Sequence, residues 1–509
     1  MQQAIFLFTS VILPTLCWIL YQLYFCPLSK FPGPFWAKIN PFWHAYQVST
    51  GQRHKRFTRL HQQYGREVFE FSQRVLGDIV RVGLNDISVC NVSGQRDLHQ
   101  HGVTLIKSPG YNAFRADLRY SNVFNEQNKI AHGQLRREIS AAFSTRSLEG
   151  LEKYVEKNVV AFCNGIKRFG KDGKQPLKDI TLWSTFLTFD VLGDLCFSKT
   201  YGMLETGVKN PIIEAVQSSV RMTSVFAIAP HLLFLMLRVS PKNLIEKRRL
   251  ESYDRLRERL STKSVRKDFF HYLVDNGKFE ETDEADIGHL QSIMQTFLGA
   301  GGDTTSCTVS FVSYFTHSLA TITAAIYYLC KNPLAQSKLR QEVAKEFYSV
   351  EDISHRRLAT LTYLNAVIEE TLRIAPPVLG ELPRLTTAPD TIVAGCHFPI
   401  GVTLSNCHYA LSRDARYFTD PESFIPERWF ENGFDKDQTL GVEAKYQPFS
   451  LGPRKCIGFS MAYMEIRLTL AHWIFQFDAE LEDPFYRYEP EDYTLAIRPP
   501  LLVKARSRL

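Results

Sequence analysis

The 509-residue sequence has no two cysteines at the close C-x-x-C spacing that is typical of metal-binding and redox sites. Its ten cysteines are scattered along the chain, none forms a C-x-x-C pair, and most lie in apolar runs. This spacing excludes a tetrahedral zinc set, and in a reducing compartment such cysteines act as small apolar side chains. Disulfides would require a lumenal body, in which case the "NVS" sequon at Asn91 would become a candidate for glycosylation.

Nucleotide-binding motifs are also missing. No G-x-G-x-x-G follows a predicted strand and no G-x-x-x-x-G-K-[ST] occurs, which excludes an evident nicotinamide, flavin or ATP site. No repeat period or linker-like block divides the chain, so we predict one large domain. The net charge is +7. The basic residues form no dense stripe with aromatics between them, which argues against nucleic acid and favours a membrane surface or an acidic protein partner.

Charge is absent from the first 29 residues, since Lys30 is the first charged side chain. The apolar stretch 4–25 is long enough to span a bilayer, which takes about 20 residues of helix. It lacks the basic start and small-residue cleavage site of a secretory signal. We predict a membrane anchor over 1–29 and the main domain over 30–509, with a buried core helix as the alternative. The positive-inside rule places the main domain in the cytosol, because basic residues follow the anchor: Lys30, Lys38, Arg53, Lys55 and Arg56.

Helical periodicity dominates the rest of the chain, while strand signals are few. The apolar pattern predicts helices over 134–167, 181–197, 244–262, 287–330, 333–349 and 361–374. Short alternating runs predict strands over 78–83, 86–90, 391–394, 402–406 and 494–504. The sequence therefore predicts a mainly α (α+β) fold with small β-sheets, preceded by one N-terminal transmembrane helix.

One cysteine lies in an unusual turn. In "FSLGPRKCIG", the residues Phe449, Gly452, Arg454, Cys456 and Gly458 have the spacing F-x-x-G-x-R-x-C-x-G. A lone thiolate can be the sole protein ligand of a metal when a porphyrin supplies the other ligands. The basic residues and backbone N–H groups of such a turn favour the thiolate, and the glycines let the backbone approach it closely. A buried structural cysteine before a helix is the alternative.

These residues resemble the haem-binding loop of the cytochrome P-450 superfamily, and the resemblance covers nearly the whole chain. It implies a P-450-like helical domain that binds haem b (iron protoporphyrin IX), with Cys456 as the metal ligand and Phe449 packed beside it. In "EETLR", Glu370 and Arg373 are similar to the family's E-x-x-R helix, and "PERW" supplies Arg428, which the family joins to that pair. Trp429 stands where the family often has phenylalanine, a change that we expect to be harmless.

The segment "LGAGGDTTSCTVSFV" resembles the centre of the family's long helix over the haem. Glycines in a helix interior cost roughly 1 kcal/mol each relative to alanine, so they call for a reason. The resemblance implies that Asp303 and Thr304 are an acid–alcohol pair that supplies protons during dioxygen activation. A simple flexible kink is the alternative.

Three arginines and a histidine resemble the family's contacts to the haem propionates: Arg136, Arg384, Arg454 and His132. Arginine suits a carboxylate because its fork binds two oxygens at once, although each of these residues alone could be an ordinary surface arginine. His132 stands where tryptophan is usual, and "HGQLRREISAAFS" is similar to fungal microsomal members of secondary metabolism.

By resemblance, substrate contacts come from 109–128, 378–380, the residues around Ala300 and 493–496. The apolar run 225–239 is either a lip at the membrane interface or a plain buried helix.

The resemblance implies a haem-thiolate monooxygenase of the endoplasmic reticulum membrane, single-pass and cytosolic, that inserts oxygen from O2 into a lipophilic small molecule. Electrons would come from NADPH through a separate NADPH-cytochrome reductase, with cytochrome b5 as an optional second donor. A tailoring step in terpenoid, polyketide or alkaloid biosynthesis is the expected role. Two alternatives stay open: an enzyme that rearranges or couples its substrate without net oxygen insertion, and a haem-binding membrane protein without turnover.

Overall fold

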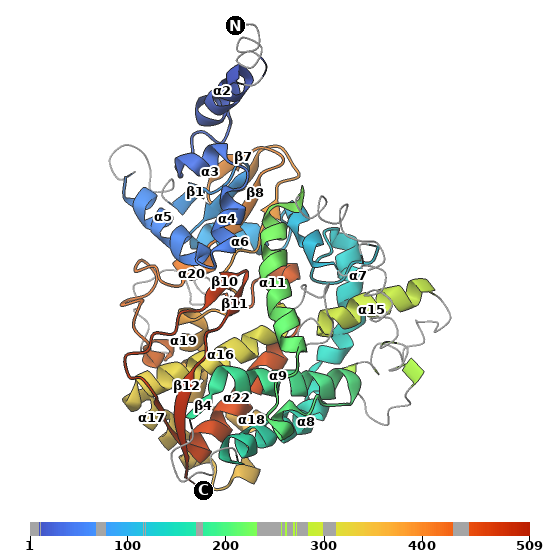
Figure 1. Cartoon of the computed structure of the whole chain (residues 1–509), viewed down its shortest axis with the longest axis vertical. Helices are drawn as coiled ribbons and strands as arrows, with labels where there is room; N and C mark the ends of the chain where they lie inside the picture. The colour runs from blue at the N-terminus through green and yellow to red at the C-terminus, as the bar shows by residue number, and fades with distance from the viewer. Residues whose placement is uncertain are drawn as a thin grey trace.

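The computed structural model describes residues 10, 12–67, 78–115, 117, 119–168, 177–231, 256, 260–261, 268–269, 271, 284–298, 312–430 and 447–508. Within them the predicted mainly helical fold with small sheets is confirmed. Strands β1 (Ile79–Arg81), β7 (Cys396–Phe398) and β8 (Thr403–Asn406) lie at the end of the molecule from which the N-terminal helix projects (Figure 1). Strands β4 (Leu177–Asp179) and β12 (Leu502–Ser507) lie with long helices such as α8 (Thr145–Arg168) and α22 (Phe459–Gln476) at the other end.

The helical core is built around α22 (Phe459–Gln476), which begins directly after the cysteine turn. It packs against α16 (Val312–Lys331), α8 (Thr145–Arg168) and α19 (Thr362–Ile374), while α9 (Ile180–Phe197) packs on α8 and α16. Helix α22 is apolar nearly all round, which is typical of a helix buried on every side, and its Trp473 is only 1% exposed. The turn that carries Cys456 is therefore joined to a helix that is buried along most of its length.

The remaining helical elements surround this core. They are α2 (Leu13–Leu20), η2 (Tyr21–Phe25), α3 (Phe35–Ile39), α4 (Trp43–Ser49), α5 (Arg53–Glu67), α6 (Val92–His99), η4 (Pro109–Phe114), α7 (Lys129–Ser140), η5 (Ala141–Phe143), α10 (Met203–Thr206), α11 (Ile212–Ile228), α15 (Glu284–Leu298), α17 (Pro333–Glu346), η6 (Val350–Asp352), α18 (His355–Leu358), α20 (His408–Leu411), η7 (Pro426–Trp429) and η8 (Gly452–Arg454).

The largest sheet has the strand order β1-β2-β8-β5-β3. Its strands are β1 (Ile79–Arg81), β2 (Asp86–Val89), β8 (Thr403–Asn406), β5 (Arg384–Leu385) and β3 (Ile106–Lys107). Only the β2–β8 pair is parallel, and the antiparallel pairing of β3 with β5 places Lys107 opposite Arg384. Three smaller sheets are formed by β4 (Leu177–Asp179), β12 (Leu502–Ser507) and β9 (Phe477–Leu481), by β10 (Glu491–Tyr493) and β11 (Leu495–Ile497), and by β6 (Thr391–Val393) and β7 (Cys396–Phe398).

The prediction of one helix over 134–167 is wrong. Helix α7 ends at Ser140, a short 3-10 turn follows, and α8 begins at Thr145. The break lies at Ser144, whose backbone is extended and whose hydroxyl accepts a hydrogen bond from the N–H of Ser147 at 3.3 Å. A serine that satisfies a free N–H in the first turn favours a new helix start over continuation. The predictions over 181–197, 333–349 and 361–374 are confirmed as α9, α17 and α19.

Two other helix predictions fall partly on residues that are not described. The stretch 287–330 contains α15 and α16, and 299–311 between them lies outside the described residues. Most of 244–262 also lies outside the described residues. Of the apolar run 225–239, residues 225–228 belong to α11, and residues 232–239 lie outside the described residues.

Alternation of apolar residues predicts several of the strands but not the very short ones. The predictions at 78–83, 86–90, 391–394 and 402–406 are confirmed as β1, β2, β6 and β8. The single strand over 494–504 is wrong, because β11 and β12 are separated by a segment that contains Pro499 and Pro500, which cannot donate to a ladder. The sequence does not predict β3, β4, β5, β7, β9 and β10.

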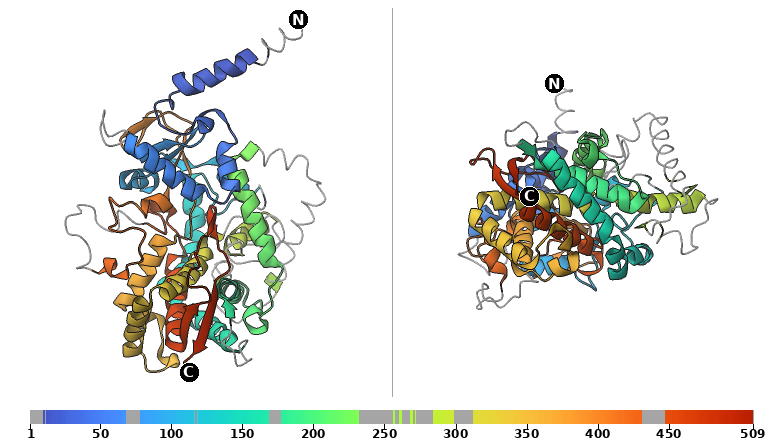
Figure 2. Two further views of the ribbon diagram at one scale, coloured as in Figure 1. Left: turned by 60° about the vertical axis from the view of Figure 1, so that its left-hand side comes forward. Right: turned by 90° about the horizontal axis from the view of Figure 1, so that it is seen from below.

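The N-terminal helix α2 projects away from the body of the molecule in two views (Figures 1 and 2), whereas Gln22 of the π-helix η2 accepts hydrogen bonds from Arg81 of β1. Among the residues described, no helix has both the length and the apolar character needed to cross a membrane. The predicted transmembrane helix over 4–25 falls partly on residues 1–9 and 11, which lie outside the described residues. The anchor over 1–29 therefore stays a prediction.

Candidate active site

Cys456 lies at the end of a tight turn that precedes α22. The N–H of Cys456 donates to the carbonyl of Phe449 at 2.9 Å, and the N–H of Lys455 donates to that of Gly452 at 3.0 Å. Gly452 has φ +63°, and a Cβ there would overlap the carbonyl oxygen of His99. Only glycine meets both conditions without strain. The predicted turn geometry is therefore present, and it holds the cysteine against the start of the core helix.

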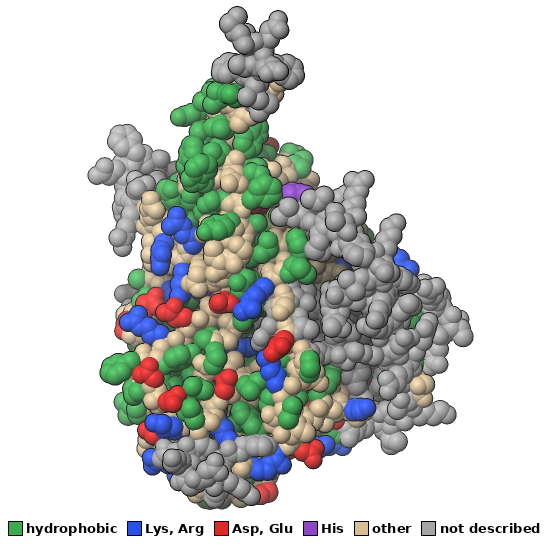
Figure 3. All heavy atoms as spheres, viewed as in Figure 1, with side chains coloured by type: hydrophobic (Ala, Val, Ile, Leu, Met, Phe, Trp, Pro, Cys, Tyr) green, Lys and Arg blue, Asp and Glu red, His purple; other side chains and the backbone are tan. Residues whose placement is uncertain are grey.

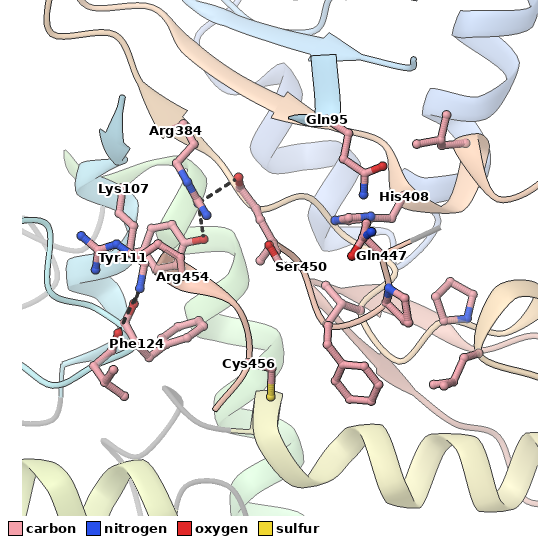
Figure 4. Close-up of a pocket in the computed structure, with 18 of the residues that line it drawn as sticks. Gln95, Lys107, Tyr111, Phe124, Arg384, His408, Gln447, Ser450, Arg454 and Cys456 are labelled. Atoms are coloured by element: carbon pink, nitrogen blue, oxygen red, sulfur yellow. Dashed lines mark hydrogen bonds between the residues drawn. The ribbon is translucent and has the colours of Figure 1, made fainter. Parts of the chain in front are cut away.

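The thiol of Cys456 opens onto a cavity of about 910 Å³ (Figure 4). Burial raises the pKa of this thiol to about 12, against smaller lowering effects of the N–H of Gly458, then Arg136 and Lys455. A thiol in such a place ionises only when a metal or another strong cation displaces its proton. The cavity is lined by Gln95, Lys107, Tyr111, Val123, Phe124, His132, Arg136, Leu372, Pro376, Val378, Leu382, Arg384, His408, Leu411, Ser412, Gln447, Pro448, Phe449, Ser450, Arg454 and Cys456.

Six residues predicted from the sequence therefore line one cavity, although they come from distant parts of the chain. They are His132 and Arg136 of α7, Arg384 of β5, and Phe449, Arg454 and Cys456 of the turn. Asp303 and Thr304 lie outside the described residues, as does Ala300. Of the predicted substrate contacts, Tyr111, Val123, Phe124 and Val378 line this cavity, whereas 493–496 do not.

Positive charge is concentrated on the cavity wall. Arg136 donates to the carbonyl of Lys455 at 2.7 Å, and Arg454 donates to the carbonyls of Glu126 and Gln127 at 2.7 and 3.2 Å. Arg384 donates to the hydroxyl of Tyr111 at 3.3 Å and to two backbone carbonyls. The acceptors of Arg136 and Arg384 in these bonds are neutral, so the bonds do not cancel the charge of either side chain.

Sequence reasoning missed a fourth cation, Lys107. Its ammonium group donates to the carbonyl oxygens of Val123, at 3.1 Å, and Phe124, and its side chain is buried. Burial, with Arg454 and Arg384 nearby, holds the pKa of Lys107 well below its usual range. No motif marks this lysine in "LIKSPGY"; it reaches the cavity because β3 pairs with β5 and places it opposite Arg384.

The same charges act on His132. Burial, followed by Lys107 and the arginines, lowers the pKa of His132 to about 2, so its imidazole is neutral. Within the described residues, no carboxylate lies within ion-pair distance of Lys107, Arg136 or Arg384. A buried wall with this excess of positive charge is suited to a ligand that carries negative charge. The two carboxylates of haem match this requirement, and the single thiol matches its iron, so the residues present fit this group.

Beneath the cavity, Glu370 of α19 joins two arginines. Its oxygens accept from Arg373 at 2.8 and 2.9 Å and from Arg428 at 3.0 Å, and Glu370 and Arg373 are fully buried. Arg373 also donates to the carbonyls of Ser412 and Pro421 at 2.8 and 2.7 Å. The arrangement expected from E-x-x-R and "PERW" is confirmed in geometry. It ties the segment 412–428 to α19, whose Leu372 lines the cavity.

A single-thiol site opposite a cation-lined wall, on a mainly helical fold, defines the class of haem-thiolate proteins. The cytochrome P-450 family model matches residues 32–503, and the chain belongs to that family. The family implies haem-thiolate iron, and the enzyme is a cytochrome P-450 monooxygenase.

The chain is similar over nearly its full length to fungal proteins. It is 30% identical to the cytochrome P-450 monooxygenase astJ of Aspergillus oryzae, over 92% of this chain and 91% of that protein. It is 29% identical to the trichothecene C-15 hydroxylase of Fusarium sporotrichioides, over 95% of this chain and 94% of that protein. It is 28% identical to the cytochrome P-450 monooxygenase atnE of Emericella nidulans, over 94% and 90%. The expected likeness to fungal members is confirmed.

Proposed function

We propose that this monooxygenase inserts one oxygen atom from O2 into a lipophilic small molecule, as a tailoring step in secondary metabolite biosynthesis of the terpenoid, polyketide or alkaloid type. The observation that carries the proposal is the meeting of the Cys456 thiol and four cationic side chains at one cavity. The similar fungal monooxygenases support it, and the hydroxylase among them favours oxygen insertion over rearrangement or coupling.

When bound, haem supplies a redox-active iron that can activate dioxygen. Cys456 is the proposed metal ligand, and the N–H of Gly458 donates to its sulfur. Phe449 packs against Tyr463 and Phe459, with ring centroids 5.3 and 6.4 Å away, and excludes water from the thiol side. Arg136, Arg384 and Arg454, with the neutral imidazole of His132, bind and orient the haem carboxylates.

Asp303 and Thr304 are proposed as the proton-supplying pair. In this proposal the Thr304 hydroxyl holds a water, and Asp303 passes protons to it from solvent. The assignment is supported by the motif "AGGDTT" within the matched family range. A hydroxyl can both donate and accept, which suits it to such a relay.

Electrons reach this enzyme from NADPH through a separate NADPH-cytochrome reductase, with cytochrome b5 as an optional second donor. The absence of nicotinamide and flavin motifs from the sequence supports an external electron supply.

The proposed location is the endoplasmic reticulum membrane, with residues 1–29 as a single-pass anchor and 30–509 as the cytosolic catalytic domain. Apolar side chains cover the projecting N-terminal helix (Figure 3). Leu13, Leu16 and Leu20 are each more than two-fifths exposed, which is unfavourable in water. A chain without residues 1–28 should bind haem and lose its carbonate-resistant membrane association. An integral membrane fraction for the truncated chain would contradict the anchor.

Cys456→Ser tests the function at its centre. Only a thiolate ligand gives the strongly red-shifted absorption of the reduced carbon monoxide complex, so the variant should lose that band. Cys396→Ser, which changes a partly buried cysteine of β7, is the matched control and should keep it. Persistence of the band in Cys456→Ser would refute the assignment.

Oxygen stoichiometry then separates the alternatives. In reductase-containing microsomes, a monooxygenase consumes one O2 for each oxygen atom inserted. Product formed without incorporated ¹⁸O from labelled O2 would indicate rearrangement or coupling, and haem binding without any turnover would indicate the non-catalytic alternative.

A further inference from the structure

A second cavity of about 990 Å³ adjoins the cysteine cavity. The two share Tyr111, Phe124 and Leu382 in their walls. The segment 381–385 lies between them, because Leu382 and Arg384 line the first cavity while Glu381 and Leu385 line the second. A molecule in the second cavity would therefore contact residues that also line the cysteine cavity.

Most of the second cavity's wall is apolar, but several buried polar side chains line it as well: His44, Arg53, Ser108, Glu381 and Ser405. His44 of α4 is 4% exposed and Glu381 is 5% exposed, and both line the cavity. The apolar part includes Pro109, Phe114, Ala227, Ile228 and Pro230. Polar groups this deeply buried need hydrogen-bond partners.

One atom of this pair has no partner among the described residues. The Nδ1 of His44 lies 3.2 Å from a carboxylate oxygen of Asp86, which can only accept, so Nδ1 carries the proton. The Nε2 of His44 is buried and makes no hydrogen bond within the described part of the chain. It lies 3.8 Å from Oε2 of Glu381, which is too long for a direct hydrogen bond.

Glu381 is fixed in place from the other side. Its Oε1 accepts from the hydroxyl of Ser88 at 2.7 Å, and Ser88 lies 3.0 Å from Nε2 of His61. Arg53 also lines the cavity, but its guanidinium donates twice to Asp492, at 3.1 and 3.0 Å. Burial raises the pKa of Glu381, and His44 and Arg53 oppose this. The carboxyl group therefore stays close to His44 without an arginine to neutralise it directly.

From this geometry we infer that His44 and Glu381 form a hydrogen-bonding site for a hydroxyl group on an otherwise apolar ligand. A hydroxyl donates and accepts, so it can donate to Nε2 of His44 and accept from Glu381 when that group is protonated, or donate to Glu381 when it is ionised. A carboxylate ligand would be repelled by Glu381 and Asp86. The inference rests on the proposed function in taking this ligand as the substrate, whose hydroxyl is held here while its apolar part lies against Tyr111 and Phe124, which also line the haem-binding cavity.

Direct binding to the purified haem-loaded enzyme tests the site without requiring turnover. The probes are 1-decanol and 1-methoxynonane, isomers of the same size, of which only the alcohol can donate a hydrogen bond. Calorimetric titration of the wild type should give roughly tenfold tighter binding of the alcohol, since a buried hydrogen bond to such a group contributes about 1.4 kcal/mol. A ratio of one or below in the wild type would overturn the site.

Glu381→Leu and His44→Phe should each reduce that preference to about twofold or less, by removing one partner of the hydroxyl. Leu385→Ala is the matched control: it enlarges the same cavity, so both affinities should fall and their ratio should persist. If Glu381→Leu and His44→Phe lower the melting temperature but leave the ratio unchanged, the pair is only structural and the inference is wrong.

The two proposals can fail separately. If the variants lose the preference for the alcohol but the wild type incorporates no oxygen, the hydroxyl site is supported and the proposed oxygen insertion is refuted. If the wild type incorporates oxygen but the variants keep the wild-type ratio of alcohol to ether affinity, oxygen insertion is supported and the hydroxyl site is refuted.

Discussion

The indole Nε1 of Trp429 donates a hydrogen bond to Oε2 of Glu370 at 3.0 Å. Glu370 also accepts from Arg373, from Arg428 and from the N–H of Ile425, at 2.8 Å for the last. The tryptophan is thus one of several donors around a fully buried carboxylate. Tryptophan in "PERW" is expected to be a harmless change from the family's phenylalanine, and in this contact it adds a donor that phenylalanine lacks.

Trp429→Phe should destabilise the protein while leaving haem content nearly normal. Hydrogen bonds to charged groups contribute about 1.5–3 kcal/mol, and the two arginines would still hold Glu370. The measurement is the melting temperature, with Trp36→Phe as a control because Trp36 is 61% exposed. Equal melting temperatures for Trp429→Phe and the wild type would show that the indole bond contributes nothing.

Arg373→Ala should have a larger effect on the same cluster. It leaves the buried Glu370 and the carbonyls of Ser412 and Pro421 without their main donor, at a cost of about 3–5 kcal/mol. We expect little haem-loaded protein, measured as haem absorbance per purified chain. Arg357→Ala on the exposed surface is the control, and a normal haem content in Arg373→Ala would refute the structural role.

Lys107→Met should weaken haem retention. The substitution removes one buried cation from the wall that faces the proposed carboxylates, so haem transfer to excess apomyoglobin should become about tenfold faster. Lys129→Met is the control, because Lys129 is an exposed lysine near the same wall. An unchanged transfer rate would mean that Lys107 serves only to hold the carbonyls of Val123 and Phe124.

Glu465 of α22 should make stability depend on pH. Its side chain is fully buried, and burial raises its pKa from 4.5 to about 7, against a smaller lowering effect of the Ser318 side chain. Between these values the unfolded chain is ionised and the folded chain is protonated. The unfolded state then binds fewer protons, so the free energy of unfolding should fall as pH rises from about 4.5 to about 7.

Glu465→Gln mimics the protonated acid and should remove this dependence. The variant should match the wild type near pH 4.5 and exceed it by roughly 3 kcal/mol at pH 8, from about 1.36 kcal/mol for each pKa unit. Glu480→Gln, an exposed change on β9, should leave the wild-type profile unaltered. Parallel stability curves for Glu465→Gln and the wild type would contradict a protonated Glu465.

Much of the helical fold could be predicted because its signals are local. Helices such as α19 carry a regular apolar face and lie where the sequence pattern places them. Strands β3 and β5 have two residues each, too few for any alternation to be visible. They form because the sheet is completed by distant segments, an effect of tertiary structure that no local pattern contains.

The residues of the candidate site likewise fall into those that a local motif predicts and those that only the tertiary structure brings together. Arg136, Arg384, Arg454 and Cys456 could be predicted because they belong to motifs with fixed spacing. Lys107 could not, because its role follows from the pairing of β3 with β5.

Thr304→Ala and Asp303→Asn address the proton supply proposed for "AGGDTT". Without the hydroxyl that holds the relay water, Thr304→Ala should bind substrate and consume NADPH and O2, yet release much of the reduced oxygen as hydrogen peroxide. Asp303→Asn should instead slow the whole reaction and increase the solvent isotope effect, because proton delivery becomes limiting. General acid–base groups contribute about 100- to 10,000-fold, so product formation should fall at least about tenfold in one variant. Ser306→Ala, in the same segment, is the control and should keep wild-type coupling. Wild-type rates and peroxide yields in both variants would make this segment only a kink in the helix, and the alternatives without oxygen insertion would gain weight.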